Sequence, residues 1–152
     1  MNESTTGMAV RKEVVVEAPI EVAFEVFTRG IATWWPMATH STSEARARNV
    51  TLEGRKGGRL YETDVDGKEF DWGEVTHWEP PNAVTFTWHL GRAPEIAQLV
   101  EVRFAAEGDG TRVELVHTGW ERLGEEGVEM VKNYDSGWDF VLGRYVESVV
   151  GR

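Results

Sequence analysis

Residues 99–119 read LVEVRFAAEGDGTRVELVHTG, and this stretch decides how the rest of the chain is interpreted. Two runs in which apolar and polar residues alternate flank the turn Gly108-Asp109-Gly110, a pattern typical of a β-hairpin. The turn sets three pairs of residues opposite one another on one face: Phe104 with Val113, Val102 with Leu115, and Val100 with His117. Because this face is the apolar one, we predict that His117 lies on the buried side of the sheet.

Strand signals extend from this hairpin back to the polar loop 39–45, and short turn sequences divide them. Asp66-Gly67 is a favoured two-residue hairpin turn. Such a turn sets Tyr61 opposite Trp72 and Thr63 opposite Phe70. We expect the face that carries these aromatic rings to be buried.

The hairpin around Pro80-Pro81 has two registers that the sequence leaves open. A regular ladder turns Glu74 inward and Val75 outward, which is an unusual arrangement for a sheet with one apolar face. A β-bulge near Gly73 reverses the two residues.

Helical patterns lie on both sides of the strands. Val10–Glu17 reads as a first strand, and Pro19 then suits the first turn of a short helix that contains Phe24 and Phe27. A second short helix is expected to carry Ile31, Trp34 and Trp35 before Pro36 ends it. Because the two tryptophans are adjacent on that helix, we expect at most one to point fully inward.

The last helix is predicted from Glu125 to Val150. Its apolar residues recur at helical spacing and form one stripe: Val131, Trp138, Leu142, Tyr145 and Val149. Asp135 falls on the same stripe. It is either the cap of the main helix, since residues 133–136 read NYDS, or a carboxylate that faces a cavity.

These elements predict an α+β fold. A curved antiparallel sheet of six to seven strands wraps around the long C-terminal helix, and two short helices follow the first strand. The chain has 152 residues and no internal repeat or linker. We therefore expect one domain over residues 8–150 behind a flexible start at residues 1–7.

Charge and composition exclude several classes of protein. The chain has 16 basic and 26 acidic residues and a net charge of −10, which opposes binding to nucleic acids. No apolar run is long enough to insert into a membrane. The absence of cysteine fits a cytoplasmic protein. Seven tryptophans are many for a chain of this size, and they require a common core or a cavity.

Several motifs together resemble a known superfamily. The segment VEAPIEVAF at residues 16–24 resembles the opening of the START-like, polyketide-cyclase (SRPBCC) superfamily. More specifically, the chain is similar to bacterial relatives of the activator of the heat-shock-protein-90 ATPase. The further matching motifs are Trp34-Trp35, Gly57-Gly58, Trp72-Gly73-Glu74-Val75, Glu79-Pro80-Pro81, Phe86-Thr87-Trp88, Gly108-Asp109-Gly110-Thr111, His117-Thr118-Gly119-Trp120 and Gly137-Trp138.

The resemblance implies a helix-grip fold and several alternative activities. Relatives with this fold bind lipids or hydrophobic metabolites, some cyclise polyketides, and the eukaryotic namesake contacts a chaperone. It also implies a link to stress response. Fold likeness does not choose among these activities.

The polar residues show no complete catalytic or metal motif. The four histidines have no metal-ligand spacing, so we predict no metal, no cofactor and no assigned catalytic residue. The registers place His77 and His89 at outward or edge positions. His117 is the best candidate for chemistry: it either contacts a ligand carbonyl or is a core histidine bonded to a backbone carbonyl, Tyr134 or Tyr145.

We therefore predict that the protein binds a small hydrophobic or amphipathic molecule in a cavity between the sheet and the last helix. The expected ligand-binding residues are Trp35, Tyr61, Trp72, Glu74, Phe86, Trp88, His117, Tyr134 and Trp138. One alternative is a cavity enzyme of the cyclase or hydrolase type. A second alternative is a protein-binding module that modulates a chaperone ATPase, and further expected partners are a chaperone or a second copy in a homodimer.

Overall fold

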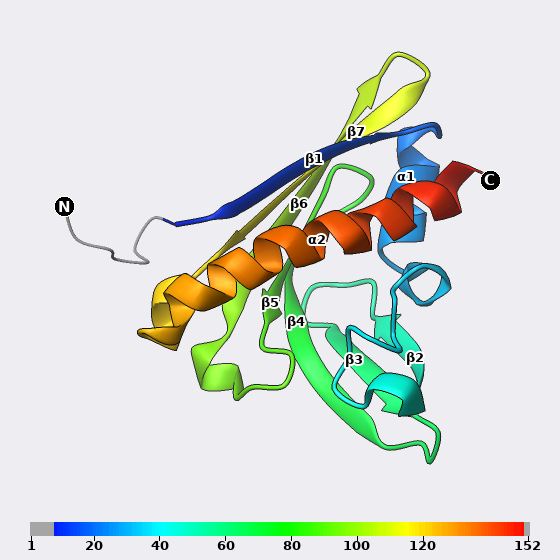
Figure 1. The fold of residues 1–152 in the computed structure, drawn as a ribbon. Helices are drawn as coiled ribbons and strands as arrows, with labels where there is room; N and C mark the ends of the chain where they lie inside the picture. The colour runs from blue at the N-terminus through cyan, green and yellow to red at the C-terminus, as the bar shows by residue number, and fades with distance from the viewer. Residues whose placement is uncertain (1–7, 151–152) are drawn as a thin grey trace.

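The computed structural model describes residues 8–150, in which a curled antiparallel sheet of seven strands wraps around a long C-terminal helix (Figure 1). The strands are β1 (Val10–Val16), β2 (Ala47–Leu52), β3 (Arg59–Asp64), β4 (Glu69–Glu79), β5 (Ala83–Trp88), β6 (Gln98–Glu107) and β7 (Gly110–Thr118). The helices are α1 (Ile20–Phe27), α2 (Glu126–Val150) and the short 3₁₀ turns η1 (Ile31–Thr33), η2 (Glu44–Arg46), η3 (Pro94–Ile96) and η4 (Trp120–Leu123).

The strands follow the order β1-β7-β6-β5-β4-β3-β2, and all neighbours are antiparallel. This confirms the predicted α+β helix-grip fold. The N-terminal segment of residues 1–7, which was expected to be flexible, lies outside the described residues. Within residues 8–150, no helix is long and apolar enough to cross a membrane.

The β6–β7 hairpin has the predicted register. Phe104 lies opposite Val113, and Val100 lies opposite His117. Both strands alternate between buried and more exposed residues, and His117 is fully buried. The hairpin was predictable because both strands carry the same apolar alternation and the glycine turn fixes their pairing.

The predicted register of the β3–β4 hairpin is wrong by one residue. Tyr61 lies opposite Asp71, and Glu62 lies opposite Phe70. The connection is a three-residue loop over residues 65–67, in which the Asp64 carboxylate accepts hydrogen bonds from the N–H groups of Asp66 and Lys68, and Gly67 adopts a positive φ of 84°. A slip of one residue exchanges the two faces, so Glu62 points into the fold and Tyr61 does not.

A β-bulge on β4 settles the next register. Leu60 lies opposite Gly73 while Tyr61 lies opposite Asp71, so Trp72 is the extra residue on β4. A second irregularity on β4, between Val75 and His77, sets Val75 opposite Phe86 and turns it inward, while Glu74 is exposed. Val75 therefore faces inward and Glu74 outward, as in the bulged alternative, but β4 carries a second bulge at Thr76 besides the one near Gly73.

The segment after β1 contains one α-helix and one short turn. α1 buries Phe24 and Phe27, while the expected second helix is only the 3₁₀ turn η1. Both Trp34 and Trp35 are buried, so the expectation that only one points inward is wrong. The chain leaves helical geometry after Thr33, which directs the two neighbouring indoles to different acceptors, the carbonyl oxygens of Val26 and His40.

α2 lies across the concave face of the sheet (Figure 1). Trp138, Leu142, Tyr145 and Val149 of its apolar stripe are buried. The helix runs without a break through residues 133–136, so Asp135 is neither a cap nor a cavity residue. Instead its exposed carboxylate lies 3.1 Å from Lys12 Nζ and connects α2 to β1.

Candidate ligand pocket

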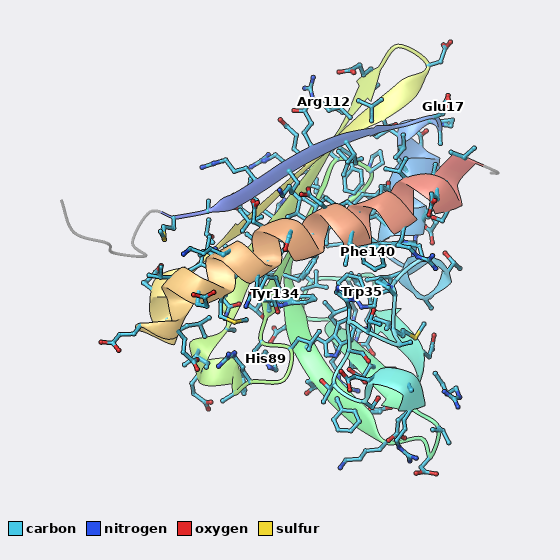
Figure 2. The ribbon with its side chains drawn as sticks, in the orientation of Figure 1. Glu17, Trp35, His89, Arg112, Tyr134 and Phe140 are labelled. Carbon is cyan, nitrogen blue, oxygen red and sulfur yellow. The ribbon has the colours of Figure 1, made fainter. Side chains whose placement is uncertain are left out.

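A pocket of about 220 Å³ lies between α2, the end of β5 and the loop of residues 36–43, here called the 36–43 loop. Its apolar lining consists of Trp35, Trp88, Leu90, Trp138 and Val141. Its polar lining consists of Thr39, His40, Ser41, Asn133 and Tyr134. Figure 2 shows Tyr134 and Trp35 along the edge of α2 that faces β4 and the lower part of the sheet.

Three tryptophans form one side of the pocket. We call Trp35, Trp88 and Trp138 the tryptophan wall. Their ring centroids are separated by 5.7 Å, 5.8 Å and 5.9 Å, so each indole contacts the other two. They come from the segment that follows η1, from β5 and from α2, and these three parts meet only in the folded chain. Such a cluster of large rings presents flat apolar surface to a ligand.

Gly137 leaves room beside the wall. It lines the pocket from α2, and a Cβ atom placed on it meets no atom within 4 Å. A larger residue here would extend into the pocket.

Tyr134 lines the pocket, and its hydroxyl group is bonded to the tryptophan wall. Trp88 Nε1 donates a hydrogen bond to Tyr134 Oη at 2.9 Å. Burial raises the pKa of the Tyr134 phenol above its usual value, and the hydrogen bond from Trp88 offsets only part of this effect. The side chain is therefore neutral at physiological pH and keeps its hydroxyl hydrogen.

The 36–43 loop closes over the pocket from the other side. Its His40 ring stacks on Phe140 of α2, with centroids 5.3 Å apart and planes inclined by 24°. Burial lowers the pKa of His40, which favours the neutral imidazole. Trp35 Nε1 donates to the His40 carbonyl oxygen at 2.6 Å, so the loop is bonded to the tryptophan wall.

Glu62 anchors the same loop from beneath. Its fully buried carboxylate accepts hydrogen bonds from the backbone N–H groups of Thr42 at 2.6 Å and Ser43 at 2.9 Å, and from Trp72 Nε1 at 2.7 Å. Burial alone would raise the pKa of Glu62, but these bonds and the Ser43 hydroxyl outweigh it and lower the pKa. The residue is therefore an ionised loop anchor.

His117 lies behind the pocket and does not line it. Trp138 Nε1 donates to His117 Nδ1 at 3.0 Å, so Nε2 carries the ring hydrogen and faces Gln98 Oε1 at 3.4 Å. Burial lowers the pKa of His117 to about 3. The rings of Trp120 and Tyr134 pack against it at 4.1 Å and 5.1 Å. The structure therefore favours the core-histidine alternative, but the hydrogen-bond partners are Trp138 and Gln98 instead of a backbone carbonyl, Tyr134 or Tyr145.

The other predicted site residues fall into three groups. Trp35, Trp88, Tyr134 and Trp138 line the pocket. Trp72 and Phe86 lie behind it and contact wall indoles. Tyr61 and Glu74 lie outside it, because the shifted register turns Tyr61 toward Arg59 and the two bulges of β4 leave Glu74 exposed.

Sequence reasoning missed the loop residues Thr39, His40 and Ser41, because the polar segment gave no sign that it folds back onto α2. It also missed Leu90, Asn133, Gly137 and Val141. The glycine inside the last helix was a usable signal, since helices rarely place glycine next to a buried tryptophan without a packing reason.

The remaining histidines do not form a metal site. His77 is exposed as expected, whereas His89 is buried, contrary to its expected outward or edge position. The His89 ring reaches the Arg92 carbonyl oxygen at 3.0 Å, which compensates for its burial. Within residues 8–150, no group of three or more histidine, aspartate or glutamate side chains is arranged to hold a metal ion.

Solved structures with the same fold include a synthase, a resistance protein and an Aha1 dimer. The chain is 39% identical to Txn09, described as an anthrahydroquino-gamma-pyrone synthase, over 82% of this chain and 84% of that one, with a TM-score of 0.58. It is 29% identical to CalC from Micromonospora echinospora, described as a self-sacrificing resistance protein, over 93% of each chain, with a TM-score of 0.70.

The Aha1 dimer from Colwellia psychrerythraea shares the fold at a TM-score of 0.69 and 14% identity, over 94% of this chain and 96% of that one. A search of the curated proteins gave no match. The family model described as "Activator of Hsp90 ATPase homolog 1-like protein" matches residues 17–145, which include all elements from α1 to most of α2. The chain therefore belongs to the family of activator of Hsp90 ATPase homolog 1-like proteins.

Proposed function

We propose that the protein binds a small, flat aromatic molecule in the pocket between α2 and the 36–43 loop. The tryptophan wall carries this proposal, because three mutually packed indoles line a pocket of about 220 Å³. The volume lies below the roughly 300–1,000 Å³ of sites for drug-sized ligands, which favours a compact ligand of two or three fused rings.

The similarity to Txn09 supports the aromatic character of the ligand. That protein is described as an anthrahydroquino-gamma-pyrone synthase, and its identity to this chain is 39%. Among residues 8–150, no carboxylate lines the pocket, so its walls suit a neutral apolar ring system.

A substitution at Gly137 tests the proposal. Gly137→Leu places a side chain in the pocket. The same substitution removes a glycine from the interior of a helix, which stabilises the helix by about 0.5–1 kcal/mol. The fold is therefore retained while the binding space is filled. We expect 1,8-dihydroxyanthraquinone to quench the tryptophan fluorescence of the wild type in a saturable way and to bind Gly137→Leu at least tenfold more weakly.

Gly143→Leu is the matched control. Gly143 lies on an exposed part of the same helix, and a Cβ atom placed on it also meets no atom within 4 Å. This variant is expected to bind the probe as the wild type does. Equal binding by all three proteins, or no saturable quenching in the wild type, would contradict the proposal.

A cavity enzyme of the cyclase type is the second candidate. It is favoured by the similarity to a synthase and by two neutral proton-transfer groups on the pocket lining, the His40 imidazole and the Tyr134 hydroxyl. Mass spectrometry of a bound compound after incubation separates the two functions. Recovery of the unchanged compound supports binding alone, whereas a product whose formation requires His40 or Tyr134 supports the enzyme.

A further inference from the structure

We infer that Tyr134 makes the pocket selective for aromatic ketones and quinones, because its hydroxyl group donates a hydrogen bond to a ligand oxygen. The inference rests on the proposed function and names the chemical class of its ligand. It would make Tyr134 the residue that distinguishes an oxygenated ring system from the hydrocarbon of the same shape.

The hydrogen bond from Trp88 determines what Tyr134 offers. An indole N–H is a donor only, so Tyr134 Oη is the acceptor of the 2.9 Å contact. The hydroxyl hydrogen takes no part in that bond. Within residues 8–150, the Tyr134 hydroxyl group makes no hydrogen bond other than the one it accepts from Trp88. The hydroxyl hydrogen therefore remains available for a ligand in the pocket.

Aromatic neighbours hold the Tyr134 ring in place. The His117 ring lies 5.1 Å away at 77°, the Trp120 ring 5.3 Å away, and the Trp88 ring 6.4 Å away at 89°. These contacts and the bond from Trp88 fix the position of the hydroxyl oxygen before a ligand arrives. A fixed donor in a largely apolar site discriminates strongly, because an unmatched buried donor is costly.

The other two hydroxyl groups of the pocket lining, those of Thr39 and Ser41, already have partners. Ser41 Oγ donates to the Met37 carbonyl oxygen at 2.6 Å, and Thr39 Oγ1 lies 2.7 Å from His40 Nδ1. Tyr134 thus differs from the other two hydroxyl groups of the lining. Since it offers a donor, its complement on the ligand is an acceptor such as a carbonyl oxygen.

Two ligands with the same ring skeleton test the inference. 9-Fluorenone and fluorene share a flat tricyclic skeleton and differ by a carbonyl in place of a methylene group. Equilibrium dialysis gives the affinity of each for the wild type and for Tyr134→Phe. We expect the ratio of fluorenone to fluorene affinity to fall about tenfold in Tyr134→Phe, with the fluorene affinity unchanged.

Tyr145→Phe is the matched control. Tyr145 also lies on α2 and is buried, but its hydroxyl group donates to the Ala23 carbonyl oxygen at 2.7 Å and does not line the pocket. This variant should keep the wild-type affinity ratio. Circular dichroism of both variants checks that the fold is retained.

Infrared spectroscopy of fluorenone bound to the wild type tests the same bond without a variant. We expect the carbonyl stretching band at a lower wavenumber than in cyclohexane. An unshifted band, or an affinity ratio equal in wild type and Tyr134→Phe, would overturn the inference and leave the proposed function standing. If neither compound binds and 1,8-dihydroxyanthraquinone also fails to bind, the proposed function fails and the inference fails with it.

Discussion

At the scale of the residue, His117 is a neutral side chain in the centre of the aromatic core. It is fully buried, and its Nδ1 accepts the indole hydrogen of Trp138 at 3.0 Å. A protonated imidazole would lose this acceptor and would place a charge among aromatic rings. Protonation of His117 would therefore disturb the packing of Trp138, a residue of the tryptophan wall.

This connection predicts a loss of stability in mild acid. Burial lowers the pKa of His117 to about 3, whereas the unfolded chain binds the proton near pH 6.5. Between these values the unfolded state holds one more proton, so stability falls as the pH falls. From pH 7 to pH 5 the contribution of this residue to the free energy of unfolding decreases by about 2 kcal/mol.

Urea denaturation at the two pH values measures this decrease. In His117→Gln the decrease should be smaller than in the wild type by about 2 kcal/mol, whatever the absolute stability of the variant. His77→Gln, which alters an exposed histidine, should keep the wild-type decrease. The same pH dependence in His117→Gln and wild type would show that the residue is not buried in its neutral form.

At the scale of the element, the 36–43 loop depends on an anchor from a distant strand. Glu62 of β3 holds the N–H groups of Thr42 and Ser43, and stacking of His40 on Phe140 holds the other end against α2. The loop supplies much of the polar lining of the pocket. Its position is thus set by residues about 20 and 100 positions further along the chain.

Removal of the Glu62 charge should loosen this element. Glu62→Gln replaces one acceptor oxygen by an NH₂ group that faces N–H donors, so we expect a loss of about 2–3 kcal/mol in the free energy of unfolding. The binding of 1,8-dihydroxyanthraquinone should weaken as well, since the loop then loses its fixed position. The pKa of Glu62 is lowered in the folded state, so its contribution is present above about pH 4.5 and is lost as the pH falls through the folded pKa.

Chemical denaturation at pH 7 and fluorescence titration measure the two effects. Glu44→Gln, which alters an exposed carboxylate next to the same loop, is the control and should behave as the wild type. An unfolding midpoint of Glu62→Gln equal to that of the control would mean that the carboxylate does not anchor the loop.

At the scale of the whole molecule, the fold was more predictable than the site. The β6–β7 register and the α2 stripe follow from periodicity within one or two neighbouring segments. The site depends on the register of β3 and β4. The loop between these strands has three residues instead of the expected two, so the register is shifted by one position and Glu62 points inward in place of Tyr61.

The pocket itself depends on contacts that no local pattern shows. His40 meets Phe140, and Trp35 meets Trp138, across about 100 residues of sequence. Trp35, Trp88, Tyr134 and Trp138 were found because large aromatic residues on the inner faces of strands and helices tend to converge. His117 was assigned to the site because the β6–β7 register turns it inward, but it packs against Trp120, Tyr134 and Trp138 and does not line the pocket.

The tryptophan wall as a binding surface is the central claim, and indole N–H signals in a ¹H–¹⁵N correlation spectrum test it most directly. The chain has seven tryptophans, and each gives one such signal. On titration with 1,8-dihydroxyanthraquinone, the signals of the tryptophan wall should shift in a saturable way. The signals of Trp34, Trp78 and Trp120, which do not line the pocket, should stay in place. Shifts confined to those three residues, or no shift at all, would contradict the account.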